Sequence, residues 1–356
     1  MKKLMTLVLC AILTFGVVAC AAPAQTKPVA TAQPAVATAS EATQVPAAET
    51  TAPEKKVKVG FANLHERNDF AKQVRNSMER EAEKRGWEIV CVDNNADGAT
   101  AIKNADDLIT MGINYMIEFN IDAAVAPAVM EKFDAAKIPV IAVDVIHPGA
   151  IYFGANNSRA GQLAGEAAAE YIKTKWSGEY DYLVLITQPA AGEVAAIRVG
   201  NVQVGMENKG IVVPEDKIIE IDGQNDAQVA QTRIADFLMA HPDSHKIVIG
   251  TNNDVTASGA SAAAETASRK FDVAIFSQNS TAVFVEPMYA AKGDTNFIGS
   301  VGYFPHRYGE WVFPIIDKLV AGEKTEDNYY IDHVFIDWSN IAEYYPIDNL
   351  PWKNLK

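Results

Sequence analysis

The stretch IPVIAVDVIHPG, residues 138–149, is an apolar run that stops abruptly at the carboxylate of Asp144. Nearly continuous apolar runs are typical of strands in a parallel sheet, because helices cover both faces of such a sheet. No helical pattern follows directly, since Pro148 and Gly149 favour a turn. We therefore interpret Asp144 as the polar end of a buried strand, in a position where it does not cap a helix.

Similar apolar runs alternate with helical patterns from Val57 onward. The predicted strands are 57–62, 87–93, 113–119, 138–144, 182–187, 217–222, 246–251, 272–277 and 297–303. The predicted helices are 69–85, 99–111, 123–136, 158–176, 193–209, 226–240, 254–268 and 281–292. This alternation predicts an α/β protein with two doubly wound parallel-sheet lobes.

Polar residues follow several of the predicted strands, as at 93–95 and 252–254. In doubly wound folds, ligands bind at the carboxyl ends of the strands. Asn68 and Asp254 each come just before a predicted helix, where capping is a sufficient explanation. Asp144 has no such helix and lies between the two series of elements, so we predict that it faces a ligand.

Composition limits the function classes. The chain has 356 residues and a formal net charge of −14, which suits about two domains and argues against nucleic acid as a partner. The sequence holds no phosphate-binding loop, nucleophile elbow, zinc-protease or dinucleotide motif. Its cysteines give neither a disulfide framework nor a metal site. We expect no enzyme, no catalytic residue, no cofactor and no bound metal.

The N-terminus has the pattern of an exported protein. Two lysines precede an apolar stretch at residues 4–19, which is short for a membrane span and suits a signal peptide. It ends in VVAC (17–20), which resembles a bacterial lipobox with Cys20 as the lipid attachment residue; a plain secretory signal is the alternative. The following Ala-, Pro- and Thr-rich segment cannot form a core. We predict a signal peptide at 1–19 and a lipid-attached disordered tether at 20–56.

Several motifs recur in a characteristic order between Val57 and Asp337. They are RNDF (67–70), IPVIAVD (138–144), ANNSRAGQLAGE (155–166), AHPD (240–243), TNND (251–254) and YFPHRYGEWV (303–312). In this order the chain resembles the ribose/galactose-type periplasmic solute-binding proteins, the receptors of bacterial ABC sugar importers. The resemblance implies the type I periplasmic binding protein-like fold, two lobes joined by a three-crossing hinge. It places 57–154 and 304–332 in one lobe, and 155–303 and 333–356 in the other.

Sugar binding needs carboxylates, amides and arginine for hydroxyl groups, and aromatic rings for the apolar face of the sugar. The resemblance implies ligand contacts at Asn68, Phe70, Phe119, Asp144, Arg198, Asn225, Asn253, Gln278 and Tyr303. It also implies a small-molecule ligand, expected to be a sugar, and an ABC permease in the cytoplasmic membrane as partner. The expected protein is a monomer in the periplasm or on the outer face of the cytoplasmic membrane.

The sequence departs from the family pattern at several of these positions. Val145 replaces the usual arginine, Ala71 replaces a second aromatic residue, and the strand before Ser280 ends without the usual carboxylate. The pocket therefore has altered chemistry and could take a modified or less polar sugar, or a non-sugar such as a nucleoside. His147 is either a replacement donor or part of a turn before Pro148.

Two other classes of protein share this type of core. A regulator of the LacI type would need a DNA-binding helix-turn-helix in residues 1–56, where the sequence predicts a signal peptide and a tether instead. A receptor that presents its ligand to a chemotaxis or signalling partner would use the same fold and the same pocket. The sequence argues against the first class and leaves the second open.

Overall fold

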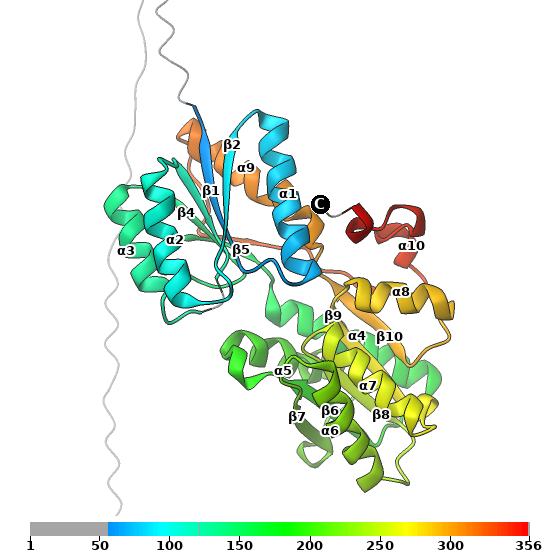
Figure 1. Ribbon diagram of the computed structural model, residues 1–356. Helices are drawn as coiled ribbons and strands as arrows, with labels where there is room; N and C mark the ends of the chain where they lie inside the picture. The colour runs from blue at the N-terminus through cyan, green and yellow to red at the C-terminus, as the bar shows by residue number, and fades with distance from the viewer. Residues whose placement is uncertain (1–55, 121, 355–356) are drawn as a thin grey trace, which may run out of the picture. The chain divides into compact units, whose positions relative to one another are not determined.

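The computed structural model describes residues 56–120 and 122–354 (Figure 1). The chain divides into Met1–Glu54 and Lys55–Lys356, and the following concerns the second unit. The predicted signal peptide, Cys20 and, apart from Lys56, the predicted tether lie outside the described residues. None of the helices in the described ranges is both long and apolar enough to cross a membrane.

The first lobe is built on a six-stranded parallel sheet in the order β11-β5-β4-β3-β1-β2. Its strands are β1 (Lys58–Asn63), β2 (Glu88–Asp93), β3 (Tyr115–Glu118), β4 (Val140–Val143), β5 (Ile151–Gly154) and β11 (Asn328–Tyr330). Its helices are α1 (Asp69–Arg85), α2 (Gly98–Thr110), α3 (Ala126–Ala136) and α9 (Tyr308–Ala321). Helices α1 and α9 cover one face of the sheet, and α2 and α3 cover the other (Figure 1).

The second lobe has a six-stranded sheet in the order β12-β10-β9-β8-β6-β7, in which only the edge strand β12 is antiparallel to its neighbour. Its strands are β6 (Tyr182–Thr187), β7 (Ile218–Asp222), β8 (Ile247–Thr251), β9 (Val273–Asn279), β10 (Phe297–Gly302) and β12 (Phe335–Asp337). Its helices are α4 (Asn157–Lys175), α5 (Glu193–Asn208), α6 (Ala227–Ala240), α7 (Asp254–Thr266), α8 (Ala282–Ala291) and α10 (Ile341–Tyr344). Its short 3₁₀ helices are η1 (Pro189–Ala191), η2 (Glu215–Lys217), η3 (Lys270–Asp272), η5 (Ile347–Asn349) and η6 (Pro351–Asn354). A further one, η4 (Pro305–Arg307), leads into α9 and packs against α1 of the first lobe.

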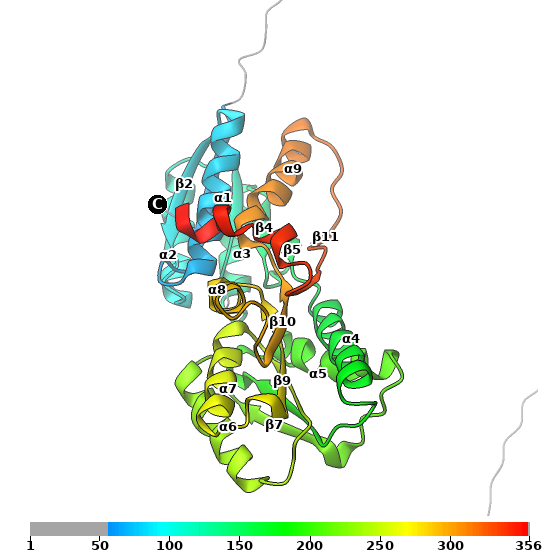
Figure 2. The same ribbon diagram turned by 90° about the vertical axis from the view of Figure 1, so that its right-hand side faces the viewer.

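The chain passes between the two sheets three times. The first crossing follows β5, the second lies between β10 and α9, and the third lies between β11 and β12. The fold class inferred from the sequence is therefore confirmed: two doubly wound α/β lobes joined by three crossings. Helices α4 and α5 lie side by side on one face of the second sheet (Figure 2).

Local signals explain why the predicted helices form where they do. The side chain of Asn68 accepts a hydrogen bond from the backbone N–H of Ala71 and so caps α1, which ends at Gly86 with a left-handed φ of 65°. Asn253 caps α7 in the same way. These caps fix helix ends independently of tertiary packing, so the predicted range of α1 agrees with the observed one.

The sequence pattern did not predict β5, α9, β11, β12 or α10. The short strands and α10 contain too few residues to show a period, so only their pairing in the folded chain defines them. Helix α9 contains Pro314, which normally marks a helix boundary in a sequence. It forms because its apolar side chains, including Val312 and Phe313, are buried against α1 and the first sheet.

Candidate ligand-binding site

Asp144 follows β4 in the first lobe and has a left-handed backbone conformation, with φ 61°. Its Oδ1 accepts a hydrogen bond from the backbone N–H of Ala155 at 3.1 Å. Its Oδ2 accepts one from the hydroxyl of Tyr308 at 3.1 Å. A Cβ atom on Gly154 would lie 2.6 Å from Asp144 Oδ1, so glycine is required there for the carboxylate to reach Ala155. The carboxylate is thus fixed by the adjacent crossing and by α9.

Burial raises the pKa of Asp144 to about 6, and this effect is offset in part by its two donors and by the positive charge of Arg198. Asp144 belongs to the first lobe, whereas Arg198 lies on α5 of the second. Both are among the predicted ligand contacts, and the charge of Arg198 acts on the pKa of Asp144 from the other lobe.

Arg198 is held by several groups of the second lobe and the second crossing. Its Nε donates to Asn157 Oδ1 at 2.9 Å, and its Nη1 donates to the backbone carbonyl of Asn252 at 3.2 Å. Its guanidinium lies over the ring of Tyr303, 4.9 Å from the ring centroid. The side chain of Arg198 is therefore half-buried and fixed on three sides, unlike a solvated charge on a helix surface.

Tyr303 and Gln278 form a buried support beneath Arg198. The hydroxyl of Tyr303 donates to Gln278 Oε1 at 3.4 Å, and Gln278 Nε2 donates to the carbonyl of Ala160 at 3.3 Å. Both side chains are almost fully buried. In this structure the amide of Gln278 is used inside the second lobe, so its contribution is to position Tyr303.

Asn253 and Asn225 form a pair at the carboxyl edge of the second sheet. Asn253 Nδ2 donates to Asn225 Oδ1 at 2.5 Å, and Asn225 is exposed with a φ of 53°. Next to them, Asn252 donates to Gln188 Oε1 at 2.8 Å and leaves its own Oδ1 buried without a partner in the described part of the chain. Buried acceptors are rarely left unpaired, so this edge has spare capacity for a polar ligand.

Aromatic side chains of the first lobe connect to Asp144 through Tyr308. The ring of Phe70 meets that of Tyr308 edge-on at 5.8 Å and that of Phe119 at 6.5 Å. Phe70 is half-buried and packs against apolar clusters of both lobes, whereas Phe119 is 2% exposed and belongs to the core. Asn68 is exposed, and its side-chain oxygen Oδ1 already accepts the hydrogen bond that caps α1.

The geometry thus brings Phe70, Asp144, Arg198 and Tyr303 into one connected cluster, with Gln278 behind it. Asn225 and Asn253 lie beside it, at the edge of β8, and Asn68 and Phe119 have evident local roles in capping and in the core. Sequence reasoning missed Tyr308 and Asn157 as members of this cluster. Both lie inside motifs that were recognised as whole blocks, so each polar side chain in those motifs was a detectable signal.

The sequence left the role of His147 open and interpreted Asp254 as a helix cap. The second interpretation is wrong, because Asn253 caps α7 and Asp254 is the first residue of that helix. His147 is buried and its Nδ1 lies 3.0 Å from the carbonyl of Val145, which favours the turn over a replacement donor. Asp254 accepts hydrogen bonds from Ser277, Ser300 and Thr281, which join β9, β10 and the start of α8. Asp254 is therefore a structural acid of the second lobe.

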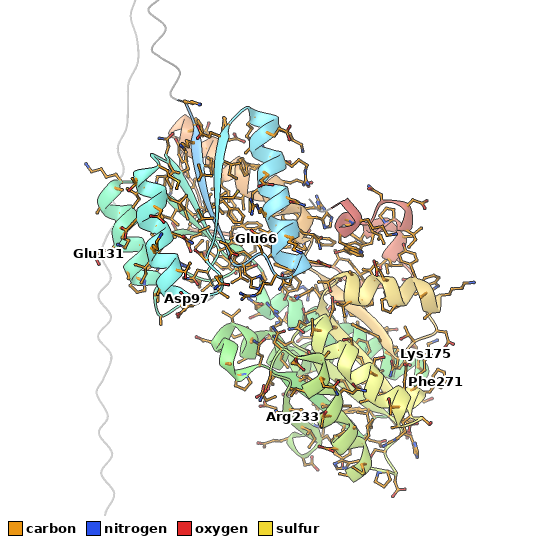
Figure 3. All side chains as sticks on the ribbon, viewed as in Figure 1. Glu66, Asp97, Glu131, Lys175, Arg233 and Phe271 are labelled. Carbon is orange, nitrogen blue, oxygen red and sulfur yellow. The ribbon has the colours of Figure 1, made fainter. Side chains whose placement is uncertain are left out.

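Other features of the described residues lie apart from this cluster. A surface hollow of about 430 Å³, lined by residues including Tyr180, Val212 and Lys217, lies where β6 and β7 begin, at the opposite edge of the sheet. In the ranges that the structure describes, no group of three or more His, Cys, Asp or Glu could hold a metal ion. Figure 3 shows Glu66 and Asp97 at the edge of the first lobe where β1 and β2 end, the same edge that carries Asp144.

Two α/β lobes, three crossings and a polar and aromatic cluster at the carboxyl ends of the strands define a solute-binding protein of type I. The chain belongs to the family of the periplasmic binding protein domain, whose family model matches residues 59–324. This confirms, at the level of the family, the resemblance seen in the sequence motifs.

Known relatives and solved structures agree with this assignment. The chain is 25% identical over 268 residues to the ribose import binding protein RbsB of Salmonella typhimurium, covering 74% of this chain and 85% of the relative. It is similar in fold to an ABC transporter solute-binding protein from Actinobacillus succinogenes with bound D-allose (TM-score 0.69, 18% identity, 81% of this chain and 100% of that one). A solute-binding protein from Bacillus halodurans with bound myo-inositol is similarly close (TM-score 0.68, 18% identity, 82% and 97%).

Proposed function

We propose that this protein is the solute-binding component of an ABC importer and captures a small carbohydrate between its two lobes. The observation that carries the proposal is that Asp144 of the first lobe and Arg198 of the second are both bonded to the first crossing, at Ala155 and at Asn157. Relatives that import ribose, and similar folds that hold D-allose or myo-inositol, support a polyhydroxyl ligand.

The cluster has the chemistry that a sugar requires. The carboxylate of Asp144 can accept hydrogen bonds from neighbouring hydroxyl groups, and the guanidinium of Arg198 donates through a planar fork. Phe70, which is half-buried, offers ring surface to the apolar face of a sugar, and the fully buried ring of Tyr308 supports it from behind. Because Val145 brings no charge, the ligand is expected to be neutral and to have an apolar patch on the side of the first lobe.

Binding would act by shifting an equilibrium between open and closed lobes. A ligand held by both lobes binds the closed form more tightly, so it stabilises that form without any covalent step. The family consists of solute-binding proteins, which supports a role without catalysis. The closed form would then dock on a membrane permease as a monomer.

We also propose that the protein is exported and attached to the membrane through a lipid on Cys20. The support is the lipobox-like VVAC and the periplasmic character of the family. A Cys20→Ser variant expressed in a bacterial host should leave the membrane fraction and appear in the soluble fraction. A variant that stays in the membrane fraction as the wild type does would contradict the lipid anchor.

The ligand class is tested by thermal unfolding of the full chain with D-ribose, D-allose, myo-inositol, hexoses, disaccharides and nucleosides. A ligand at a hundred times its dissociation constant adds about 2.7 kcal/mol to the free energy of unfolding, which raises Tm by several degrees. A sugar or polyol that raises Tm supports the proposal. A shift with nucleosides alone, or with none of the panel, would remove carbohydrate as the ligand.

A further inference from the structure

His333 lies in the third crossing, between β11 and β12, and is 7% exposed. Its Nε2 lies 3.1 Å from the backbone nitrogen of Asn156, in the first crossing. Its Nδ1 lies 2.9 Å from the carbonyl oxygen of Gly302, where the second crossing begins. One imidazole therefore bonds to all three segments that join the lobes.

These two bonds determine the state of the ring. A backbone N–H can only donate, so Nε2 must accept from Asn156 and carry no proton. A carbonyl can only accept, so Nδ1 must carry the proton and donate to Gly302. The neutral Nδ1–H form of His333 satisfies both neighbours, whereas a protonated imidazole would lose its acceptor and with it the bond to the first crossing.

The first crossing is held at three consecutive residues. The N–H of Ala155 donates to Asp144, the N–H of Asn156 donates to His333, and the side chain of Asn157 accepts from Arg198. The two outer residues are thus held by the proposed ligand-binding groups, and the middle residue is held by the third crossing. Asn157 and Arg198 both belong to the second lobe, so a movement between the lobes acts on the bonds of Ala155 and Asn156, which lie between β5 and α4.

We propose that His333 is a positioning residue of the hinge. It couples the three crossings, so that all three change conformation together when the lobes open or close. It acts through the backbone of Asn156 and through Tyr303, whose ring lies 4.6 Å from the imidazole and also carries Arg198. The link to ligand affinity rests on the function proposed above, whereas the coupling of the crossings does not.

The charges around His333 favour the neutral ring. Burial and the positive charge of Arg198 on α5 lower the pKa of His333 to about 4, while Asp332 in its own loop opposes this. Tyr303 faces the ring from the second crossing, and the first crossing contributes the Asn156 backbone. The pKa of His333 in the folded chain lies below the ordinary value of 6.5. The contribution of the neutral ring to the free energy of unfolding therefore falls as pH drops from about 6.5 toward 4.

The test is amide hydrogen exchange in the full chain without ligand, for the wild type, His333→Phe and His333→Gln. Phe fills the space of the ring but accepts no hydrogen bond, so exchange at Asn156 should accelerate about tenfold or more. Gln offers an amide oxygen to the same N–H and should restore part of the protection. His241→Phe is the matched control, since His241 packs on Tyr182 and Phe237 away from the crossings.

Unchanged exchange at Asn156 in His333→Phe would overturn the proposal, as would equal acceleration in His241→Phe. If His333→Phe does not fold, nitrogen NMR of the wild-type imidazole decides: the proposal requires an unprotonated Nε2 at pH 7, and a proton on Nε2 would contradict it. Neither the exchange nor the NMR measurement needs a sugar. The test of His333 and the ligand screen can therefore fail independently of each other.

Discussion

Glu118 is a buried acid at the end of β3 and has only one partner. Its Oε1 accepts from Asn94 Nδ2 at 2.8 Å, while its Oε2 has no partner in the part of the chain that the structure describes. Burial raises the pKa of Glu118 to about 8, and the bond from Asn94 offsets this only in part. Burial thus favours the neutral form of Glu118, because ionisation would leave an unpaired charge inside the first lobe.

The Glu118→Gln variant should become more stable relative to the wild type as pH rises from 5 to 8. In this range the unfolded wild type, with an ordinary glutamate pKa near 4.5, releases a proton that the folded chain retains, so wild-type stability falls with pH. The difference in the free energy of unfolding between Glu118→Gln and the wild type should grow by at most about 1.4 kcal/mol per pH unit. Urea unfolding at three pH values measures it, with Glu131→Gln on the exposed surface of α3 as control (Figure 3). Parallel pH curves for wild type and Glu118→Gln would contradict the buried neutral acid.

The Asp254→Ala variant should lose roughly 2–4 kcal/mol of stability, because it leaves the hydroxyl groups of Ser277, Ser300 and Thr281 without their acceptor inside the second lobe. Asp226→Ala removes only the exposed cap of α6 and should cost about 1 kcal/mol. Chemical denaturation of the two variants measures both values. Equal losses would mean that the Asp254 network adds nothing beyond a helix cap.

The residue scale shows where sequence reasoning succeeds and where it stops. Asp144 could be identified because a carboxylate that ends an apolar run without a following helix is visible in the sequence itself. Glu118 stands in a similar run, YMIEF, but its burial depends on α2, α3 and the neighbouring strands. Tyr308 lies in the recognised motif YFPHRYGEWV, but its partner Asp144 is far away in the chain, and none of the recognised motifs contains His333.

At the scale of the elements, close packing of α4 on α5 positions Arg198. A Cβ atom on Gly161 of α4 would lie 2.1 Å from the carbonyl oxygen of Arg198, so any side chain there must push the helices apart. The same contact recurs one turn later, where a Cβ on Gly165 would lie 1.9 Å from the carbonyl of Val202. Glycine at positions 161 and 165 therefore sets the position of Arg198.

The Gly161→Ala variant should lower both stability and affinity for whichever sugar the screen identifies, because displacement of α5 moves Arg198. We expect an affinity loss of about tenfold, the value of one weakened charged hydrogen bond. Gly200→Ala, in α5 with open space around the new Cβ, is the matched control and should be neutral or slightly stabilising. Calorimetric titration of both variants checks this. Wild-type affinity in Gly161→Ala would show that helix spacing does not set the position of Arg198.

The element scale also explains the accuracy of the secondary-structure prediction. Long helices with side-chain caps, such as α1, could be placed from the sequence because the cap and the apolar period agree. Strands β5, β11 and β12 have only three or four residues, and their identity comes from partners in other parts of the chain. Pairing of distant segments is a property of the folded chain, which local patterns cannot show.

At the scale of the whole molecule, the C-terminal residues complete the core of the second lobe. Ile341, Tyr345 and Leu350 are buried in the same apolar cluster as Phe284 of α8. Tyr289 donates to the carbonyl of Tyr345 at 2.7 Å, which ties this segment to α8. Segment η6 also packs against α1 of the first lobe. The C-terminal residues are therefore part of the folded unit, beyond the end of the match to the family.

The Leu350→Ala variant should destabilise the protein by about 2–4 kcal/mol, because Leu350 is fully buried and its loss leaves a cavity. Ile347→Ala, three residues earlier with 45% of its surface exposed, should cost less than about 1 kcal/mol. Guanidinium unfolding of both variants separates them. A cost at Leu350 no larger than that at Ile347 would mean that this segment does not contribute to the core.

The measurement that tests the central claim most directly is a calorimetric titration of the best sugar from the screen into the wild type, Asp144→Ala and Arg198→Ala. Each variant removes one polar group from one lobe, so each should weaken binding by roughly 1–3 kcal/mol, while Glu131→Ala should bind as the wild type does. Weakening by both substitutions would place the ligand between the lobes. Wild-type affinity in either folded variant would contradict capture by both lobes at once.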